Sequence, residues 1–167
     1  MTSKRAGTIA AALVVAGTLG ATTLPSTAQV PPIASEALTS RADFPDGTAV
    51  KFKIKDHEGD MTVVSTKDGS KTVVVKFTIQ PGARFPWHTH AGPVVVNIKE
   101  GSLIYIDGDD CQEHPAYEAG QAFVDTGHGH VHSARNPGTT PTVFYATFFE
   151  APASGPLSIP ASAPDCA

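Results

Sequence analysis

The sequence lacks the residue clusters that mark several common classes of protein. Lysine and arginine total 12 against 16 acidic residues, and the basic residues are scattered along the chain without forming a cluster. No nucleic acid or anionic membrane is therefore expected as a partner, since both bind clustered positive charge. There is also no Gly-rich phosphate loop, no Cys-x-x-Cys pair and no ordered Ser, His and Asp set of the hydrolase type. The chemistry of these motifs is therefore not expected here.

The sequence after the N-terminal region shows no sustained helical period, and 15 glycines and 14 prolines interrupt the chain. Short runs rich in β-branched and aromatic residues lie between them, as is typical of strands. The predicted strands cover residues 50–54, 61–66, 71–80, 94–98, 102–106, 121–125 and 141–150. Between the second and third strands, Asp68-Gly69 is a strong signal for a hairpin turn. Many short strands without helices predict an all-β sandwich or barrel.

The first 28 residues have the pattern of a cleaved secretory signal peptide. Lys4 and Arg5 form a short basic region, residues 6–20 are apolar and uncharged, and small residues follow at 26–28. The apolar run is too short for a comfortable membrane span, and a retained anchor is the alternative interpretation. We therefore predict a secreted, extracellular protein with no membrane contact after cleavage. The mature chain, residues 29–167, keeps 10 basic residues against 16 acids, a net charge of about −6.

Only two cysteines are present, Cys111 and Cys166. An even number of cysteines in an exported chain favours a disulfide, because the compartment is oxidising. Cys166 lies in a tail rich in Pro, Ala and Ser, residues 151–167, which has little local reason to fold. A bridge would attach this tail to the loop around Cys111. The alternative makes Cys111 a metal ligand beside His114, although a single Cys-x-x-His carries little specificity.

The pattern with the clearest chemical meaning is the pair His88 and His90. Side chains at positions i and i+2 of a strand point to the same face, so both imidazoles can reach one point. Imidazole is a common protein ligand for Zn, Cu, Fe and Ni. A second group follows downstream at His128, His130 and His132, which also share one face if the segment is extended. The sequence therefore predicts one metal site built from two histidine segments.

These two segments resemble the two sequence motifs of the cupin superfamily, over residues 73–150. The matching positions are Gly82, His88, His90 and Gly101 in the first motif, and Gly120, His132 and Asn136 in the second. Val94 stands where the first motif has a glutamate, and the middle of the second motif is one residue longer and lacks the proline of the family. The resemblance implies a small secreted protein with one cupin domain. Its fold would be a single antiparallel β-barrel of the jelly-roll type over residues 46–150, between an N-terminal arm at 29–45 and the C-terminal tail.

The resemblance also implies one divalent transition metal, held by His88, His90 and His132. His130 competes with His132 as the third ligand, or acts as a fourth ligand in place of the glutamate that Val94 replaces. Three-histidine sites occur in some iron dioxygenases of the family, so a metal-dependent enzyme acting on a small molecule is implied. Dioxygenase is the first reaction class, and isomerase or lyase comes next. A non-catalytic exported protein that binds a metal or a small ligand is the alternative, because the sequence shows no clear general base.

Zinc or copper is the expected metal, with iron as the catalytic alternative. A chain exported unfolded meets its metal outside the cytoplasm, where the affinity order favours Cu and Zn over Fe or Mn. A homodimer is also expected, because cupin barrels often pair edge to edge. Near the motifs, Phe85 and Trp87 could line a substrate pocket or pack in the core, and Tyr105 could reach into the barrel as a hydrogen-bond donor.

Overall fold

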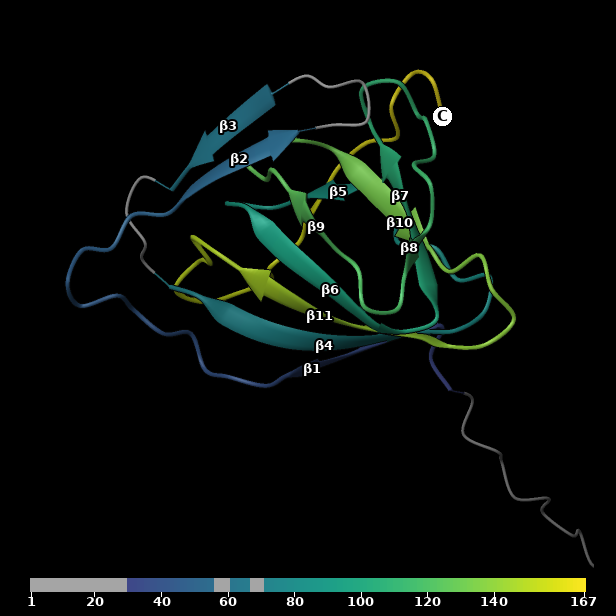
Figure 1. Ribbon diagram of the computed structural model, residues 1–167, viewed down its shortest axis with the longest axis horizontal. Helices are drawn as coiled ribbons and strands as arrows, with labels where there is room; N and C mark the ends of the chain where they lie inside the picture. The colour runs from purple at the N-terminus through teal and green to yellow at the C-terminus, as the bar shows by residue number, and fades with distance from the viewer. Residues whose placement is uncertain (1–29, 56–60, 67–70) are drawn as a thin grey trace, which may run out of the picture.

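The computed structural model describes residues 30–55, 61–66 and 71–167, and these ranges contain strands and no helix (Figure 1). The strands are β1 Ile33–Ala37, β2 Lys51–Lys55, β3 Met61–Ser65, β4 Val73–Ile79, β5 His88–Thr89, β6 Val94–Glu100, β7 Ser102–Asp107, β8 Tyr117–Glu118, β9 Ala122–Asp125, β10 His132–Arg135, β11 Thr142–Phe148 and β12 Ile159–Pro160. The prediction of an all-β fold is confirmed. Within the same ranges, no helix exists that could cross a membrane.

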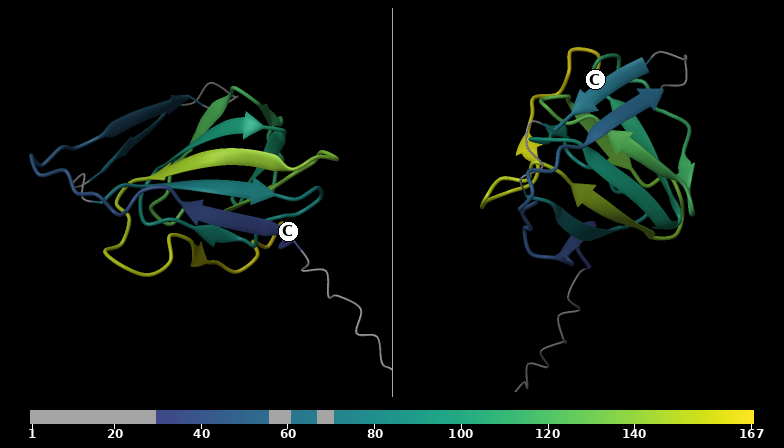
Figure 2. Two further views of the ribbon diagram at one scale, coloured as in Figure 1. Left: turned by 90° about the horizontal axis from the view of Figure 1, so that it is seen from below. Right: turned by 60° about the vertical axis from the view of Figure 1, so that its left-hand side comes forward.

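Two five-stranded antiparallel sheets face each other across the core (Figure 1). The strand order is β1-β4-β11-β6-β9 in the first sheet and β12-β5-β10-β7-β8 in the second, while β2 and β3 form a separate hairpin. Figure 2 shows this hairpin at one end of the two sheets. Among the described residues, the named strands of one sheet do not pair with those of the other, so the predicted closed barrel is not confirmed. The strands form two packed sheets.

The core forms because strands of both sheets point β-branched and aromatic side chains inward. Val96, Phe144 and Phe148 come from the first sheet, and Leu103 and Ala134 come from the second. Burying each of the larger side chains stabilises the fold by about 1.5–3 kcal/mol relative to exposure. The hairpin attaches through an edge-to-face contact between Phe52 and Phe149, with ring centroids 5.4 Å apart.

All seven predicted strands are present, with end points that differ by a few residues. The hairpin predicted around Asp68-Gly69 does not form between the flanking strands, because β3 pairs with β2 whereas β4 pairs with β1 and β11. The turn itself lies outside the described residues, as does the predicted signal peptide at residues 1–28. The strands that sequence patterns did not indicate are β1, β5, β8, β10 and β12, most of which are too short to show a period.

Both segments outside residues 46–150 contribute a strand to the sheets. β1 from the N-terminal arm pairs with β4 over five residues, and β12 from the C-terminal tail pairs with β5. The tail is also held by a disulfide between Cys111 and Cys166, whose Cα atoms lie 5.8 Å apart. The sulfur of Cys111 is therefore not free to bind a metal beside His114.

A glycine allows close contact between two loops near the histidines. The loop between β9 and β10 leads to His132, and it packs against the loop that follows His90. Gly127 has φ of +63°, and a Cβ at this position would overlap the carbonyl oxygen of Gly92. Gly129 has φ of +92° in the same loop, but a Cβ there would meet no atom within 4 Å. The close approach of the two loops thus requires glycine at position 127.

We expect Gly127→Ala to lower the free energy of unfolding by about 2–4 kcal/mol, because it adds a backbone overlap to an unfavourable φ. Gly129→Ala is the matched control and should cost about 1 kcal/mol, since it carries the φ penalty alone. Urea unfolding followed by circular dichroism measures both values. Equal losses for the two variants would show that the contact between the loops contributes nothing.

Candidate metal centre

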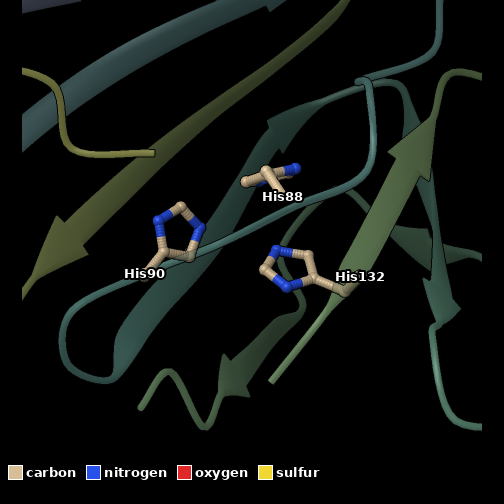
Figure 3. Close-up of side chains that lie close together, drawn as sticks. All are labelled: His88, His90 and His132. Carbon is tan, nitrogen blue, oxygen red and sulfur yellow. The ribbon is translucent and has the colours of Figure 1, made fainter. Parts of the chain in front are cut away.

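The register of two short strands brings the histidine segments together. β5 pairs with β10 so that His88 lies directly opposite His132. Paired residues on antiparallel strands point to the same face of a sheet, with Cβ atoms about 5 Å apart. His90 follows His88 by two residues and completes the group. Figure 3 shows the three side chains close together.

The three imidazoles are close enough to share one ion. A ligand nitrogen of each lies within 4.8 Å of those of the other two. The ring centroids are 4.3 Å apart for His88 and His132, 4.9 Å for His88 and His90, and 5.1 Å for His90 and His132. His90 and His132 are 6% and 5% exposed, so water has little access to them. The arrangement matches the donor set that Zn, Cu and Fe accept from proteins.

Each ring is oriented through its Nδ1 atom. His88 Nδ1 donates to the carbonyl oxygen of Pro86 at 2.8 Å, and His90 Nδ1 donates to that of Leu157 at 2.9 Å. His132 Nδ1 lies 3.5 Å from the carbonyl oxygen of His130 and 3.4 Å from Oδ1 of Asp125. Because a carbonyl oxygen only accepts, Nδ1 of His88 and His90 carries the hydrogen and Nε2 keeps its lone pair. Metal-binding histidines in proteins are commonly held by such a bond from the second ring nitrogen.

Burial favours the uncharged form of two of the three histidines. It lowers the pKa of His132 to about 4, with the neighbouring His88 and His90 adding to the effect and Asp125 opposing it. Burial also lowers the pKa of His88, against the opposing effect of the Pro86 carbonyl. Neutral imidazole is the form that binds a metal, so these side chains are ready for an ion at neutral pH.

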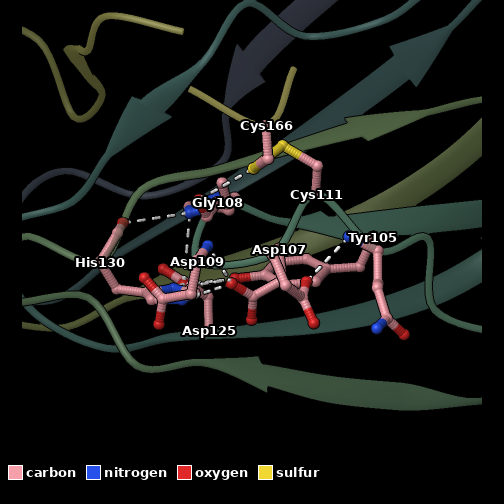
Figure 4. A network of polar contacts seen from close by, with 11 residues as sticks. Tyr105, Asp107, Gly108, Asp109, Cys111, Asp125, His130 and Cys166 are labelled. Atoms are coloured by element: carbon pink, nitrogen blue, oxygen red, sulfur yellow. Dashed lines mark hydrogen bonds and ion pairs between the residues drawn. A yellow bond between two sulfur atoms is a disulfide. The ribbon is translucent and has the colours of Figure 1, made fainter. Parts of the chain in front are cut away.

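His130 lies apart from this group, although it was predicted as an alternative or fourth ligand. Its Nδ1 is 3.2 Å from the Tyr105 hydroxyl and 3.5 Å from Asp125, and its Nε2 is 3.3 Å from Asp107 (Figure 4). The hydrogen bond with Asp125 raises the pKa of His130 to about 9, with Asp107 contributing and burial opposing. The two carboxylates thus favour the protonated form of His130.

Two further groups of potential ligands share His130 within the described residues. One contains Asp125, His130 and His132, and the other contains Asp107, Asp109 and His130. Both need His130 to lose its proton before it can bind an ion. The remaining histidines lie elsewhere: His128 pairs with Glu150, and the ring of His114 packs edge-on against Tyr105. His57 lies outside the described residues.

A small cavity of about 50 Å³ adjoins the three ligands. Most side chains that line the cavity are apolar, and Phe85 is one of them. The polar ones are the three histidines, Asp125 and Tyr105. Trp87 lies outside this cavity and stacks on Arg84, whose Cζ is 5.0 Å from the ring centroid. A larger pocket of about 740 Å³ lies on the other side of Tyr105 and Phe123, which line both spaces.

Two residues of this site could not be identified from the histidine motifs. Asp125 ends β9 and is 2% exposed, and Leu157 offers its backbone oxygen from the C-terminal tail. An acidic residue at the end of an apolar strand, just before a His- and Gly-rich loop, was the available signal for Asp125. A carbonyl contact from a segment 67 residues away leaves no signal in the sequence.

Comparison with known proteins finds a match to a family model over part of the chain. The model of the cupin domain matches residues 75–148. No curated protein matches the chain. Similar solved structures include a cupin superfamily protein from Desulfitobacterium hafniense, at 12% identity, covering 74% of this chain and 82% of that one, with a TM-score of 0.46.

Two other solved structures are similar to the chain, with comparable sequence identities and TM-scores. The cupin domain of a transcriptional regulator from Enterobacter cloacae has 17% identity, coverage of 73% and 99%, and a TM-score of 0.44. A protein with a double-stranded β-helix domain from Klebsiella pneumoniae has 20% identity, coverage of 72% and 85%, and a TM-score of 0.41. The match of the cupin family over residues 75–148 supports placing this domain in the cupin superfamily.

Proposed function

We propose that the domain binds one divalent transition metal through His88, His90 and His132. The observation that carries this proposal is the convergence of three imidazoles, two of which direct Nδ1 to a backbone carbonyl and so leave Nε2 free. Three neutral ligands keep the full dication charge on the ion, which favours anionic ligands and polarises bound groups. The residues present thus fit a metal.

We further propose that this centre serves an enzyme acting on a small molecule, of the kind that three-histidine dioxygenases represent. A metal there would supply Lewis acidity or a site for dioxygen. The chain contributes a small, largely apolar cavity, and Tyr105 lines both this cavity and the outer pocket. The outer pocket has the size that a small-molecule substrate requires.

A non-catalytic binding function is the second candidate, and the size of the inner cavity favours it. About 50 Å³ beside the ligands accommodates only a few water-sized molecules. A protein that stores or carries a metal needs no more room than this. In that case the outer pocket would have no catalytic role.

Secretion and a zinc or copper ion are part of the proposal. The disulfide between Cys111 and Cys166 supports export, because disulfides persist in oxidising compartments. In such a compartment the affinity order favours Cu and Zn, and iron would accompany the enzymatic role. The homodimer stays a prediction.

Metal analysis of the protein purified from its native source tests the proposal. We expect about one transition-metal ion per chain by mass spectrometry of the digested protein. Redox-active iron with exchangeable coordination positions would support the enzyme, and a closed zinc or copper site would support binding alone. Protein that contains no metal, and that binds no zinc, copper or iron when these ions are added, would contradict the proposed function.

A further inference from the structure

Asp125 is a buried carboxylate that the three-histidine proposal leaves unused. It is 2% exposed and lines the same cavity as the three histidines. Its Oδ1 accepts a hydrogen bond of 3.1 Å from the Tyr105 hydroxyl, whereas its Oδ2 is buried without a hydrogen-bond partner in the protein. A buried carboxylate oxygen without a hydrogen-bond partner destabilises the fold. Its presence in a cavity lined by the three histidines points to a group that binds there.

The position of Asp125 relates it to the missing motif residue. In the register of β9 on β6, Asp125 is the direct partner of Val94. Cross-strand partners point to the same face, with Cβ atoms about 5 Å apart. Val94 occupies the position at which the first motif carries a glutamate. Asp125 therefore brings a carboxylate to that part of the cavity from the neighbouring strand.

The contacts of Asp125 suit a role in holding a metal. Oδ1 lies 3.4 Å from Nδ1 of His132. It also lies 3.5 Å from Nδ1 of His130 (Figure 4). A carboxylate behind a metal-bound histidine fixes the ring and increases its basicity. One negative charge within the cavity would also offset part of the charge that three neutral imidazoles leave on a divalent ion.

We infer that Asp125 is the anionic member of the metal centre: its Oδ1 lies beside His132, and its Oδ2 faces the ion or a ligand bound to the ion. This inference rests on the proposed three-histidine site and adds a fourth residue to it. It also explains how the site accommodates valine at position 94, because the required charge comes from β9.

The test compares Asp125→Asn with Asp107→Asn in the full disulfide-bonded chain, using Co²⁺ and Zn²⁺ as probes. Asn keeps the shape of Asp125 and removes its charge. Asp107 also contacts His130 but does not line the inner cavity, so it is the matched control. We expect D125N to bind both ions about 10–100-fold more weakly than the unaltered protein, and D107N to stay within about threefold of it.

Two further measurements separate a metal role from a structural one. The metal-free D125N protein should keep its circular dichroism spectrum and its midpoint of thermal unfolding, because Asn keeps the shape of the side chain and its Oδ1 can still accept the hydrogen bond from Tyr105. Adding Val94→Glu to D125N should restore at least part of the lost affinity, since it returns a carboxylate to the same face. A changed visible spectrum of bound Co²⁺ in D125N places Oδ2 on the ion, and an unchanged spectrum with weaker binding places it on a bound ligand.

These outcomes distinguish a failure of the Asp125 inference from a failure of the proposed three-histidine site. Unaltered protein that binds neither ion would refute the three-histidine site itself. Unaltered protein that binds both, with D125N binding equally well, would overturn the role of Asp125 and leave the site intact. Loss of the fold in metal-free D125N would also overturn it, by assigning Asp125 a structural role.

Discussion

Replacing His88 and His90 together by alanine should abolish metal binding, reducing the stoichiometry from about one ion per chain to none. The two side chains are two of the three proposed ligands, and His132 alone cannot hold an ion against water. We expect the affinity for Zn²⁺ to fall by at least about a thousandfold, because most of the binding free energy comes from simultaneous coordination. Isothermal titration calorimetry on the metal-free protein measures this loss.

His128→Ala is the control for this double substitution. His128 pairs with Glu150 and belongs to none of the candidate ligand groups of the described residues. Its removal should leave Zn²⁺ affinity within about twofold, and both variants should keep the strand signal in circular dichroism. If the double variant retained full stoichiometry, the site would lie elsewhere, and His114, His128 and His130 would become the candidates.

Removing the disulfide by Cys111→Ser with Cys166→Ser is expected to lower both the stability of the fold and its metal affinity. The bridge closes a loop between residues 55 apart, for which chain entropy gives a stabilisation of up to about 4 kcal/mol. The tail it anchors contributes β12 to the second sheet and the Leu157 carbonyl to His90. We therefore expect the free energy of unfolding to fall by about 2–4 kcal/mol and metal affinity to fall about tenfold.

Chemical denaturation and metal titration, with and without reductant, measure both effects of the bridge. Reducing the unaltered protein should reproduce the behaviour of the double serine variant, and reductant should not affect the variant itself. Free-thiol titration of the unreduced protein should find no reactive cysteine. Metal affinity that does not change when the bridge is lost would show that the tail does not support His90.

The sequence predicted the content of the site better than its geometry. The spacing of His88 and His90 was enough to place both on one face, because strand periodicity is local. The position of His132 opposite His88 depends on the pairing of β5 with β10, and these strands have two and four residues. Strands of that length carry too few side chains to reveal a period or a register.

The parts of the fold that sequence analysis did not predict depend on contacts between distant segments. The C-terminal tail has the composition of an unstructured segment, yet it pairs with β5 because the disulfide holds it there. In the sequence, Asp125 is simply the last residue of a predicted strand. Its position opposite Val94 follows only from the pairing of β9 with β6. Whether a set of strands closes into one barrel or remains two sheets depends on pairings that no single strand encodes.

A crystal structure of the metal-loaded protein, with an anomalous difference map collected at the absorption edge of the bound metal, tests the central claim most directly. We predict one strong peak between His88, His90 and His132, with an imidazole nitrogen of each about 2.0–2.2 Å from it. A peak at Asp107, Asp109 and His130 instead, or no peak in protein that retains its metal, would contradict the three-histidine centre.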